Sequence, residues 1–219
     1  ARGIIAGRAV GNRMRIAPLL EQRIRLYLLL GKGDEVRRSL SSLHDIAARY
    51  GLPVLEGRAC LLDGMLANLD RKPDEAEKAF ERSLRIFRET KSERDLVNGY
   101  LESGRYALSV RNHEQAYLLL EEGLYLAKKL NLAQDKCLFY HAMGLLEAAL
   151  NESEFERAES YFTTAERFAR TVPYPEALWR IRNDLGRFYL AAGRVEHADR
   201  MLTEGLKSLR ALIQEVPEP

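Results

Sequence analysis

Histidine, cysteine and acidic side chains are the residues of this chain that could hold a metal ion or move a proton. The four histidines, His44, His113, His141 and His197, have no second histidine three or four positions away and no Cys-x-x-Cys pair nearby. Ligands on a helix need such spacings, because residues three or four apart share one face. We therefore expect no metal site and no cofactor, and we interpret these histidines as surface or groove residues.

The candidate for a phosphate-binding loop is Gly31-Lys32-Gly33. It lacks the Gly-x-x-x-x-Gly-Lys-Ser/Thr spacing and follows a helical segment rather than a strand, so a turn between helices fits it better. Acidic pairs such as Glu121-Glu122 stand in helical segments, where solvated carboxylates are normal. No nucleophile, base and orienting acid can be assigned together. We expect a protein that is not an enzyme.

Charge and cysteine content limit which binding partners and which cellular compartment the sequence predicts. Lysine and arginine number 34 against 32 aspartate and glutamate, so the net charge of +2 gives no sign of nucleic-acid or membrane binding. No apolar run reaches the ~18 residues of a transmembrane helix. The only two cysteines, Cys60 and Cys137, argue against a disulfide framework and for a reducing compartment. We expect a cytoplasmic protein.

Apolar residues three and four apart predict amphipathic helices along most of the chain, as from Ala76 to Phe87. Short polar or glycine-containing breaks separate the helices, and their Asp, Asn and Ser residues are predicted helix caps, with Pro73 in a first helical turn. The breaks within pairs are at residues 31–34, 70–74, 111–113, 151–154 and 192–194. The breaks between pairs are at residues 50–53, 90–92, 130–132 and 172–175. This pattern predicts ten helices in five antiparallel pairs.

One trio of residues recurs five times, with a small or branched residue, a large apolar residue four positions later, and a mostly small residue three positions after that. Its first members are 40, 40, 42 and 40 residues apart. A fixed period of this length indicates an array of helical repeats, and such arrays usually bind other molecules rather than transform them. The five trios are Val36/Leu40/Leu43, Ala76/Phe80/Ser83, Ala116/Leu120/Gly123, Ala158/Phe162/Ala165 and Ala198/Leu202/Gly205.

A glycine stands twelve positions before the trio in three repeats, where two helices could approach closely. The run Leu185-Gly186, then Tyr189, Ala198, Leu202 and Gly205, closely resembles the tetratricopeptide repeat (TPR), a helix–turn–helix unit. The resemblance implies an all-α fold, a right-handed α-solenoid or TPR-like superhelix of about five antiparallel helix pairs. The structural positions it assigns are Gly64, Ala76, Phe80, Gly104, Ala116, Gly144, Ala158, Phe162, Gly186 and Ala198.

The sequence departs from the TPR pattern in three ways. Gly144 precedes Ala158 by fourteen positions, and Ile24 and Val36 replace the small residues of the first repeat. The period exceeds the usual ~34 residues, which predicts longer helices. We divide the chain into an N-terminal helical remnant or cap, 1–17, and a TPR-like domain, 18–219. Its repeats are approximately 18–52, 53–92, 93–132, 133–173 and 174–215.

If the first helix of each pair lines a concave face, as the resemblance implies, its inward residues follow from the glycine position. The residue just after it is Arg25, Met65, Arg105, Leu145 or Arg187, and four positions after it stand Leu28, Asn68, Leu108, Ala148 and Leu190. Arginine is over-represented in this inward set, so a groove for an acidic or amphipathic segment is one interpretation. The other is that these arginines pair with acids on neighbouring helices. The candidate groove residues are Arg25, Arg58, Asn98, Arg105, His141, Arg180, Asn183 and Arg187.

These observations favour a non-catalytic interaction or regulatory module that binds a protein or peptide, or a neighbouring domain of its own chain. The long period also resembles TPR-like regions of bacterial signalling and transcription regulators, including the maltose-regulator and LuxR-type groups. That resemblance implies a fragment of a larger intracellular protein. The alternative is a domain that senses a small molecule or peptide and gates an attached output domain.

Overall fold

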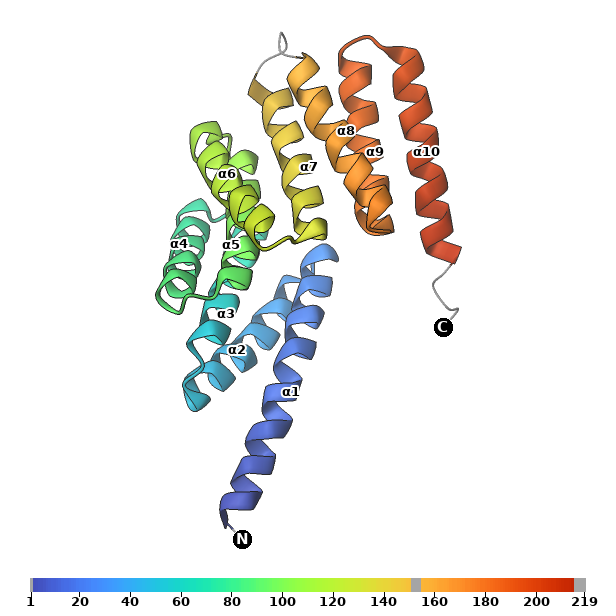
Figure 1. Cartoon of the computed structure of the whole chain (residues 1–219). Coiled ribbons are helices and arrows are strands. Elements are labelled where there is room, and N and C mark those ends of the chain that lie inside the picture. The colour runs from blue at the N-terminus through green and yellow to red at the C-terminus, as the bar shows by residue number, and fades with distance from the viewer. Residues whose placement is uncertain (1, 151–154, 215–219) are drawn as a thin grey trace. The chain divides into compact units, whose positions relative to one another are not determined.

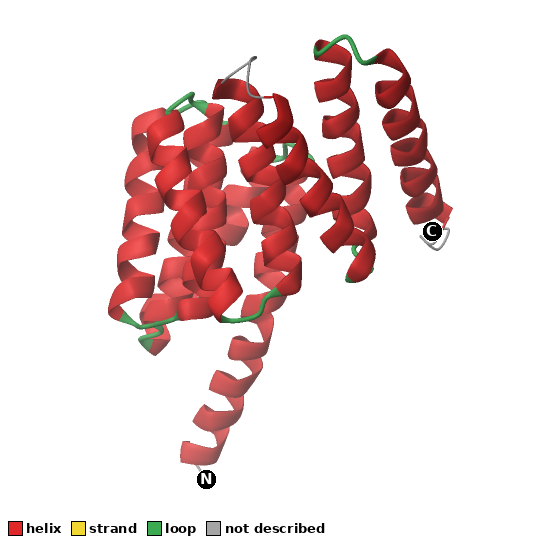
Figure 2. Ribbon diagram, turned by 45° about the horizontal axis from the view of Figure 1, so that its top comes forward, coloured by secondary structure: helices red, strands yellow, loops and turns green. Residues whose placement is uncertain are grey.

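The computed structural model describes residues 2–150 and 155–214 of the chain, and these residues form helices joined by short turns without any β-strand (Figures 1 and 2). The helices pack in antiparallel pairs, as predicted. The described helices are α1 (Arg2–Leu29), α2 (Gly33–Tyr50), α3 (Pro53–Leu69), α4 (Pro73–Glu89), α5 (Glu93–Ser109), α6 (His113–Lys129), α7 (Ala133–Leu150), α8 (Phe155–Thr171), α9 (Pro175–Ala191) and α10 (Val195–Gln214).

The turns explain the period of the sequence. From α3 to α6 each helix has 17 residues, and three residues separate one helix from the next. Two such helices and two such turns make the 40-residue repeat. A residue with a left-handed backbone stands in the turns at Gly31, Gly51, Arg71, Lys91, Arg111, Asn131 and Gly193. This conformation lets backbone N–H groups cap the preceding helix, as where Lys72 N–H donates to Ala67 O at 2.9 Å.

The predicted caps are confirmed at some helix starts and wrong at others. The Asn112 side chain accepts a hydrogen bond from Gln115 N–H at 3.2 Å, and Pro73 lies in the first turn of α4. At α2 and α4 the capping position holds Lys32 and Lys72, which make no side-chain cap. The acidic residues of these two helices lie further along the chain, inside the first turn, where the positive end of the helix dipole stabilises their negative charge. The predicted break at 151–154 lies outside the described residues.

The first helix differs from the prediction at Pro18. We expected the first helix pair to begin there, but α1 continues through Pro18 from Arg2 to Leu29. A proline inside a helix removes one backbone hydrogen bond. Ala17 and Leu20 on either side of it are buried at 4% and 8% exposure, and their packing against α2 and α3 stabilises the helix across the proline.

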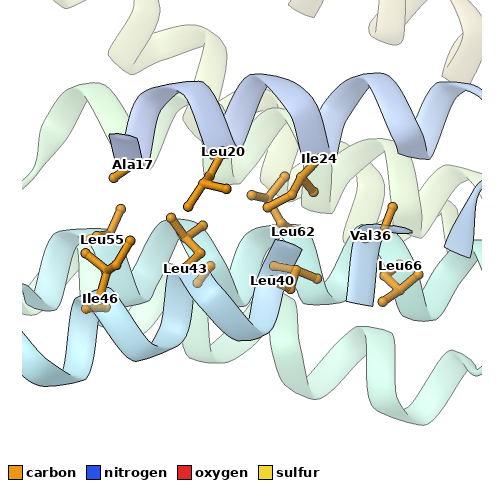
Figure 3. Close-up of a cluster of buried hydrophobic side chains, with 12 residues drawn as sticks. Ala17, Leu20, Ile24, Val36, Leu40, Leu43, Ile46, Leu55, Leu62 and Leu66 are labelled. Carbon is orange, nitrogen blue, oxygen red and sulfur yellow. The ribbon is translucent and has the colours of Figure 1, made fainter. Parts of the chain in front are cut away.

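The structure divides into two compact units, residues 1–106 and 107–219, and the boundary falls inside α5. In unit 1, the apolar faces of α1, α2 and α3 form one core. Figure 3 shows Leu20 and Ile24 of α1 above Leu43 and Leu40 of α2, with Leu62 of α3 beside them. In unit 2, Phe162, Leu185, Tyr189, Ala198 and Met201 form a core that joins α8, α9 and α10.

In three helix pairs, α3/α4, α7/α8 and α9/α10, a glycine of the first helix lies directly against a large side chain of the second. A Cβ atom added to Gly64 would lie 2.9 Å from the Phe80 ring, and one added to Gly144 would lie 2.9 Å from Phe162. At Gly186 the corresponding contact is with Leu202, at 2.7 Å. Real Cβ atoms do not come this close to a neighbour, so each glycine lets the large side chain of the second helix contact the backbone of the first. All ten structural positions assigned from the sequence are buried.

Replacing Gly64 with alanine tests this crossing. Helix propensity alone would make Gly64→Ala stabilising by about 1 kcal/mol, but overlap with Phe80 should make it destabilising by about 1–3 kcal/mol. In a Phe80→Ala background the overlap is absent, so the same change should become neutral or stabilising in urea unfolding. Gly33→Ala, which meets only the flexible Arg37 and Asp70 side chains, is the control and should change little. Equal effects of Gly64→Ala in the wild-type and Phe80→Ala backgrounds would refute the close contact between Gly64 and Phe80.

The left-handed turn residues give a second prediction. Gly51 has φ +59° and no atom within 4 Å of an added Cβ, so only the backbone conformation resists a side chain there. Gly51→Ala should destabilise unit 1 by about 1–2 kcal/mol. Gly51→Asn should cost clearly less, because asparagine tolerates this conformation. Thermal melts of the two variants would compare them directly, and equal melting temperatures would contradict the left-handed backbone conformation assigned to Gly51.

Candidate functional site

A cavity of about 260 Å³ in unit 1 lies between the inward faces of α1, α3 and α5. Four of its lining residues, Leu28, Met65, Asn68 and Arg105, stand at the inward positions expected from the sequence. The remaining lining residues are Leu29, Leu69, Phe80, Glu102 and Tyr106. Three successive first helices therefore contribute residues from two of the expected inward positions to one hollow.

The cavity combines apolar walls with one cationic group. The Phe80 and Tyr106 rings pack 5.1 Å apart, and the Tyr106 hydroxyl donates to Pro73 O at 2.8 Å, which fixes the ring. Arg105 Nη1 lies 3.4 Å from Glu102 Oε1 on the same helix. The Arg105 side chain is about one third exposed, at 35%, and reaches solvent, whereas Glu102 is only 15% exposed and relies on this contact to stabilise its charge. This arrangement suits an apolar side chain with a carboxylate beside it.

Arg58, another groove candidate, is bound within unit 1. Its guanidinium holds Asp95 with two hydrogen bonds, at 2.6 and 3.3 Å, and lies 3.5 Å from Glu21 Oε1. Burial raises the pKa of Glu21, which Arg58 and Arg25 oppose. The ion pairs join α1, α3 and α5, as the internal-pairing interpretation anticipates. Arg25 and Asn98 are half-buried.

The other four candidates lie in unit 2, where two of them meet around an acidic residue that the sequence did not single out. His141 Nε2 lies 2.9 Å from Asp184 Oδ2, and Asn183 Nδ2 donates to Asp184 Oδ1 at 3.2 Å. His141 is buried, at 7% exposure, and its contact with Asp184 links α7 to α9. Arg180 and Arg187 are exposed, and the Arg180 guanidinium lies 5.5 Å from the Trp179 ring centre. The eight candidates thus form two sets, one in each unit.

Arg182 is a further charged residue that no pattern in the sequence singles out. Its guanidinium lies 2.9 Å from Glu166 Oε1 and 3.1 Å from Glu204 Oε2, and it donates to Ser208 Oγ at 2.8 Å. The side chain is only 12% exposed. These contacts join α8, α9 and α10, so Arg182 stabilises unit 2 rather than binding a ligand.

His44 is the centre of a charged cluster on α2, α3 and α4. Its ring lies 2.7 Å from Asp63 Oδ2 and 3.0 Å from Glu56 Oε2, and Arg82 pairs with Glu56 at 2.7 Å. The hydrogen bond to Asp63, aided by that to Glu56, raises the pKa of His44 to about 9. Burial raises the pKa of the neighbouring Cys60 thiol to about 12, which disfavours the thiolate form. Within the part of the chain that the structure describes, no group of three metal-ligating side chains has the geometry of a metal site.

Comparisons with known proteins show which solved structures share this fold. No protein-family model matches the chain, and a search of curated proteins finds no match. Among solved structures, a Rap protein complexed with Competence and Sporulation Factor matches with a TM-score of 0.76 at 16% identity, over 86% of this chain and 52% of that one. BtubC (BKLC) from P. vanneervenii matches with a TM-score of 0.64 at 18% identity, over 96% and 95% of the two chains. TPR-like repeats of a Podosopora anserina kinesin light chain match with a TM-score of 0.64 at 16% identity, over 93% and 98%.

The chain therefore has a TPR-like helical repeat fold, as the sequence predicted. It spans about half the length of the Rap protein, at 52%. At these identities the likeness shows the fold alone. None of the helices described combines the length and apolarity that crossing a membrane would require.

The raised pKa of His44 predicts how stability changes with pH. Because the folded-state pKa, about 9, lies above the ordinary 6.5, the stabilisation is complete below pH 6.5 and is lost as the pH rises through about 9. After allowance for the 31% exposure of the side chain, we expect a loss of about 1 kcal/mol. Urea midpoints across this range should fall in the wild type but stay flatter in His44→Gln. His113→Gln is the matched control and should keep the wild-type slope; a steep slope in His44→Gln would contradict the assignment.

Proposed function

We propose that this chain is a non-catalytic protein-interaction module that binds an extended segment of a partner along the inward faces of α1, α3 and α5. The segment carries an apolar side chain that enters the cavity and an acidic group that pairs with Arg105. In this role the module belongs to a larger cytoplasmic signalling or regulatory protein. The buried Cys60 and Cys137 thiols are in keeping with a reducing compartment.

The observation that carries this proposal is the repetition of inward positions around the unit 1 cavity. Met65 and Arg105 immediately follow the glycine positions of their repeats, and Leu28 and Asn68 stand four positions after theirs. Leu29 and Leu69 at its edge are 71% and 41% exposed, which leaves apolar surface for a partner to cover. Asn68 adds a carboxamide that can both donate to and accept from a peptide backbone.

A second role is the sensing of an effector that gates an attached domain. It is supported by the likeness to a Rap protein whose crystal structure contains Competence and Sporulation Factor. An effector that binds the folded chain should raise its melting temperature in proportion to the logarithm of effector concentration. A module that only binds macromolecules should respond to the partner protein and not to small effectors.

Site-directed photo-crosslinking tests the interaction role. A photo-reactive phenylalanine analogue at Leu29, on the edge of the cavity, should crosslink a discrete partner in cell extract, and the same analogue at exposed Lys78 on α4 should not. Arg105→Glu should weaken this crosslink about tenfold, because it replaces a charge-assisted hydrogen bond with repulsion. Arg85→Glu, an equal charge change on the exposed face of α4, is the matched control and should leave it intact. Equal crosslinking from Lys78, or an undiminished crosslink in Arg105→Glu, would contradict the proposal.

A further inference from the structure

A second cavity, in unit 2, lies between α6, α7 and α8 and has a volume of about 500 Å³. It shares no residue with the candidate groove set. Tyrosine is its commonest lining residue, and four of the ten tyrosines of the chain gather there. We name it the tyrosine pocket; its lining aromatic residues are Tyr117, Tyr125, Tyr140 and Tyr161.

The aromatic rings of the pocket lie close to one another and to solvent. Tyr140 of α7 lies with its ring centre 6.3 Å from that of Tyr161 on α8, and its ring stacks on Phe168 at 5.6 Å. Tyr125 of α6 is 70% exposed, so its ring stands open at the pocket edge. The face of an aromatic ring carries partial negative charge and attracts cations.

The charged residues of the pocket add to this preference. Glu121 and Glu122 line it together with a single cation, Lys128, so carboxylates outnumber ammonium groups. The Tyr117 hydroxyl donates to Glu121 Oε1 at 3.3 Å and orients this carboxylate. Arg157, a cation on α8, pairs with Glu147 at 3.1 Å. Anions are therefore disfavoured in the pocket, and cations are favoured.

One cation of the protein itself already lies over an aromatic ring of the pocket. Lys128 Nζ is 5.6 Å from the centre of the Tyr140 ring. The side chain is exposed and flexible, so an incoming cation can displace it into solvent at little cost. The native contact shows that the ring face is accessible to a positive group from the side of α6.

We propose that the tyrosine pocket binds an arginine side chain of a protein partner. A guanidinium is planar, so it can stack flat on a tyrosine ring while its N–H groups donate to Glu121, whereas an ammonium has no flat face to stack. The apolar stem of arginine fits against Leu124 and Met143, the two aliphatic lining residues. This site is independent of the groove beside Arg105 and stands even if that groove binds nothing.

A titration with N-acetyl-arginine amide tests the proposal on the full chain, with the ring resonances of labelled tyrosine as the readout. Saturable shifts of pocket tyrosines, absent with the neutral isostere N-acetyl-citrulline amide, are expected. Glu121→Gln and Tyr125→Leu should each weaken binding about 2–5-fold, the equivalent of one exposed cation–π or ionic contact. Because Glu121 and Tyr125 are exposed, both variants should fold normally.

The Lys128→Gln variant best distinguishes a site for cations from a site for anions. It removes the competing cation, so it should strengthen arginine binding about 2–5-fold, whereas an anion site would be weakened by the same change. Lys129→Gln, an equal charge change at the adjacent residue, is the matched control and should leave the affinity near that of the wild type. The proposal is overturned by weaker binding in Lys128→Gln, by equal shifts with the citrulline probe, or by the absence of saturable shifts.

Discussion

The close approach of two helices at a glycine is the contact on which the rest of the structure depends. Gly64 and Gly144 lie against the Phe80 and Phe162 rings so tightly that no Cβ could replace the missing hydrogen. One of these crossings also borders the unit 1 cavity, since Phe80 is both the wedge of its helix pair and part of the cavity wall.

Charged side chains hold successive helices together around these crossings. Arg58 joins α1, α3 and α5, His44 joins α2 to α3, and Arg182 joins α8, α9 and α10. Each is partly or largely shielded from solvent, so removing one partner would leave a poorly solvated charge. Arg58, one of the arginines at the predicted inward positions, therefore serves the array itself, whereas Arg105 contacts Glu102 of its own helix.

The two units present different binding chemistry. Unit 1 has a small apolar cavity with one guanidinium, whereas unit 2 has a larger pocket of tyrosine rings with carboxylates at its edge. We propose an apolar and acidic segment as the ligand of the first and a basic side chain as the ligand of the second. Repeat arrays support such variety because each repeat contacts mainly its neighbours, so side chains away from the glycine crossings can change without disturbing them.

The sequence by itself determined the fold, because the fold depends on local periodicity. Apolar spacing set the helices, glycine and polar breaks set the turns, and the recurrence of Ala76, Ala116, Ala158 and Ala198 set the array. Only the tertiary structure decided which side chains meet. Asp184 beside His141, the three partners of Arg182 and the gathering of Tyr117, Tyr140 and Tyr161 unite residues from different helices. Helix rotation and tilt fix such contacts, and no spacing within one helix encodes them. The continuity of α1 through Pro18 has the same origin, since packing of its neighbours against α2 and α3 outweighs the local cost of the proline.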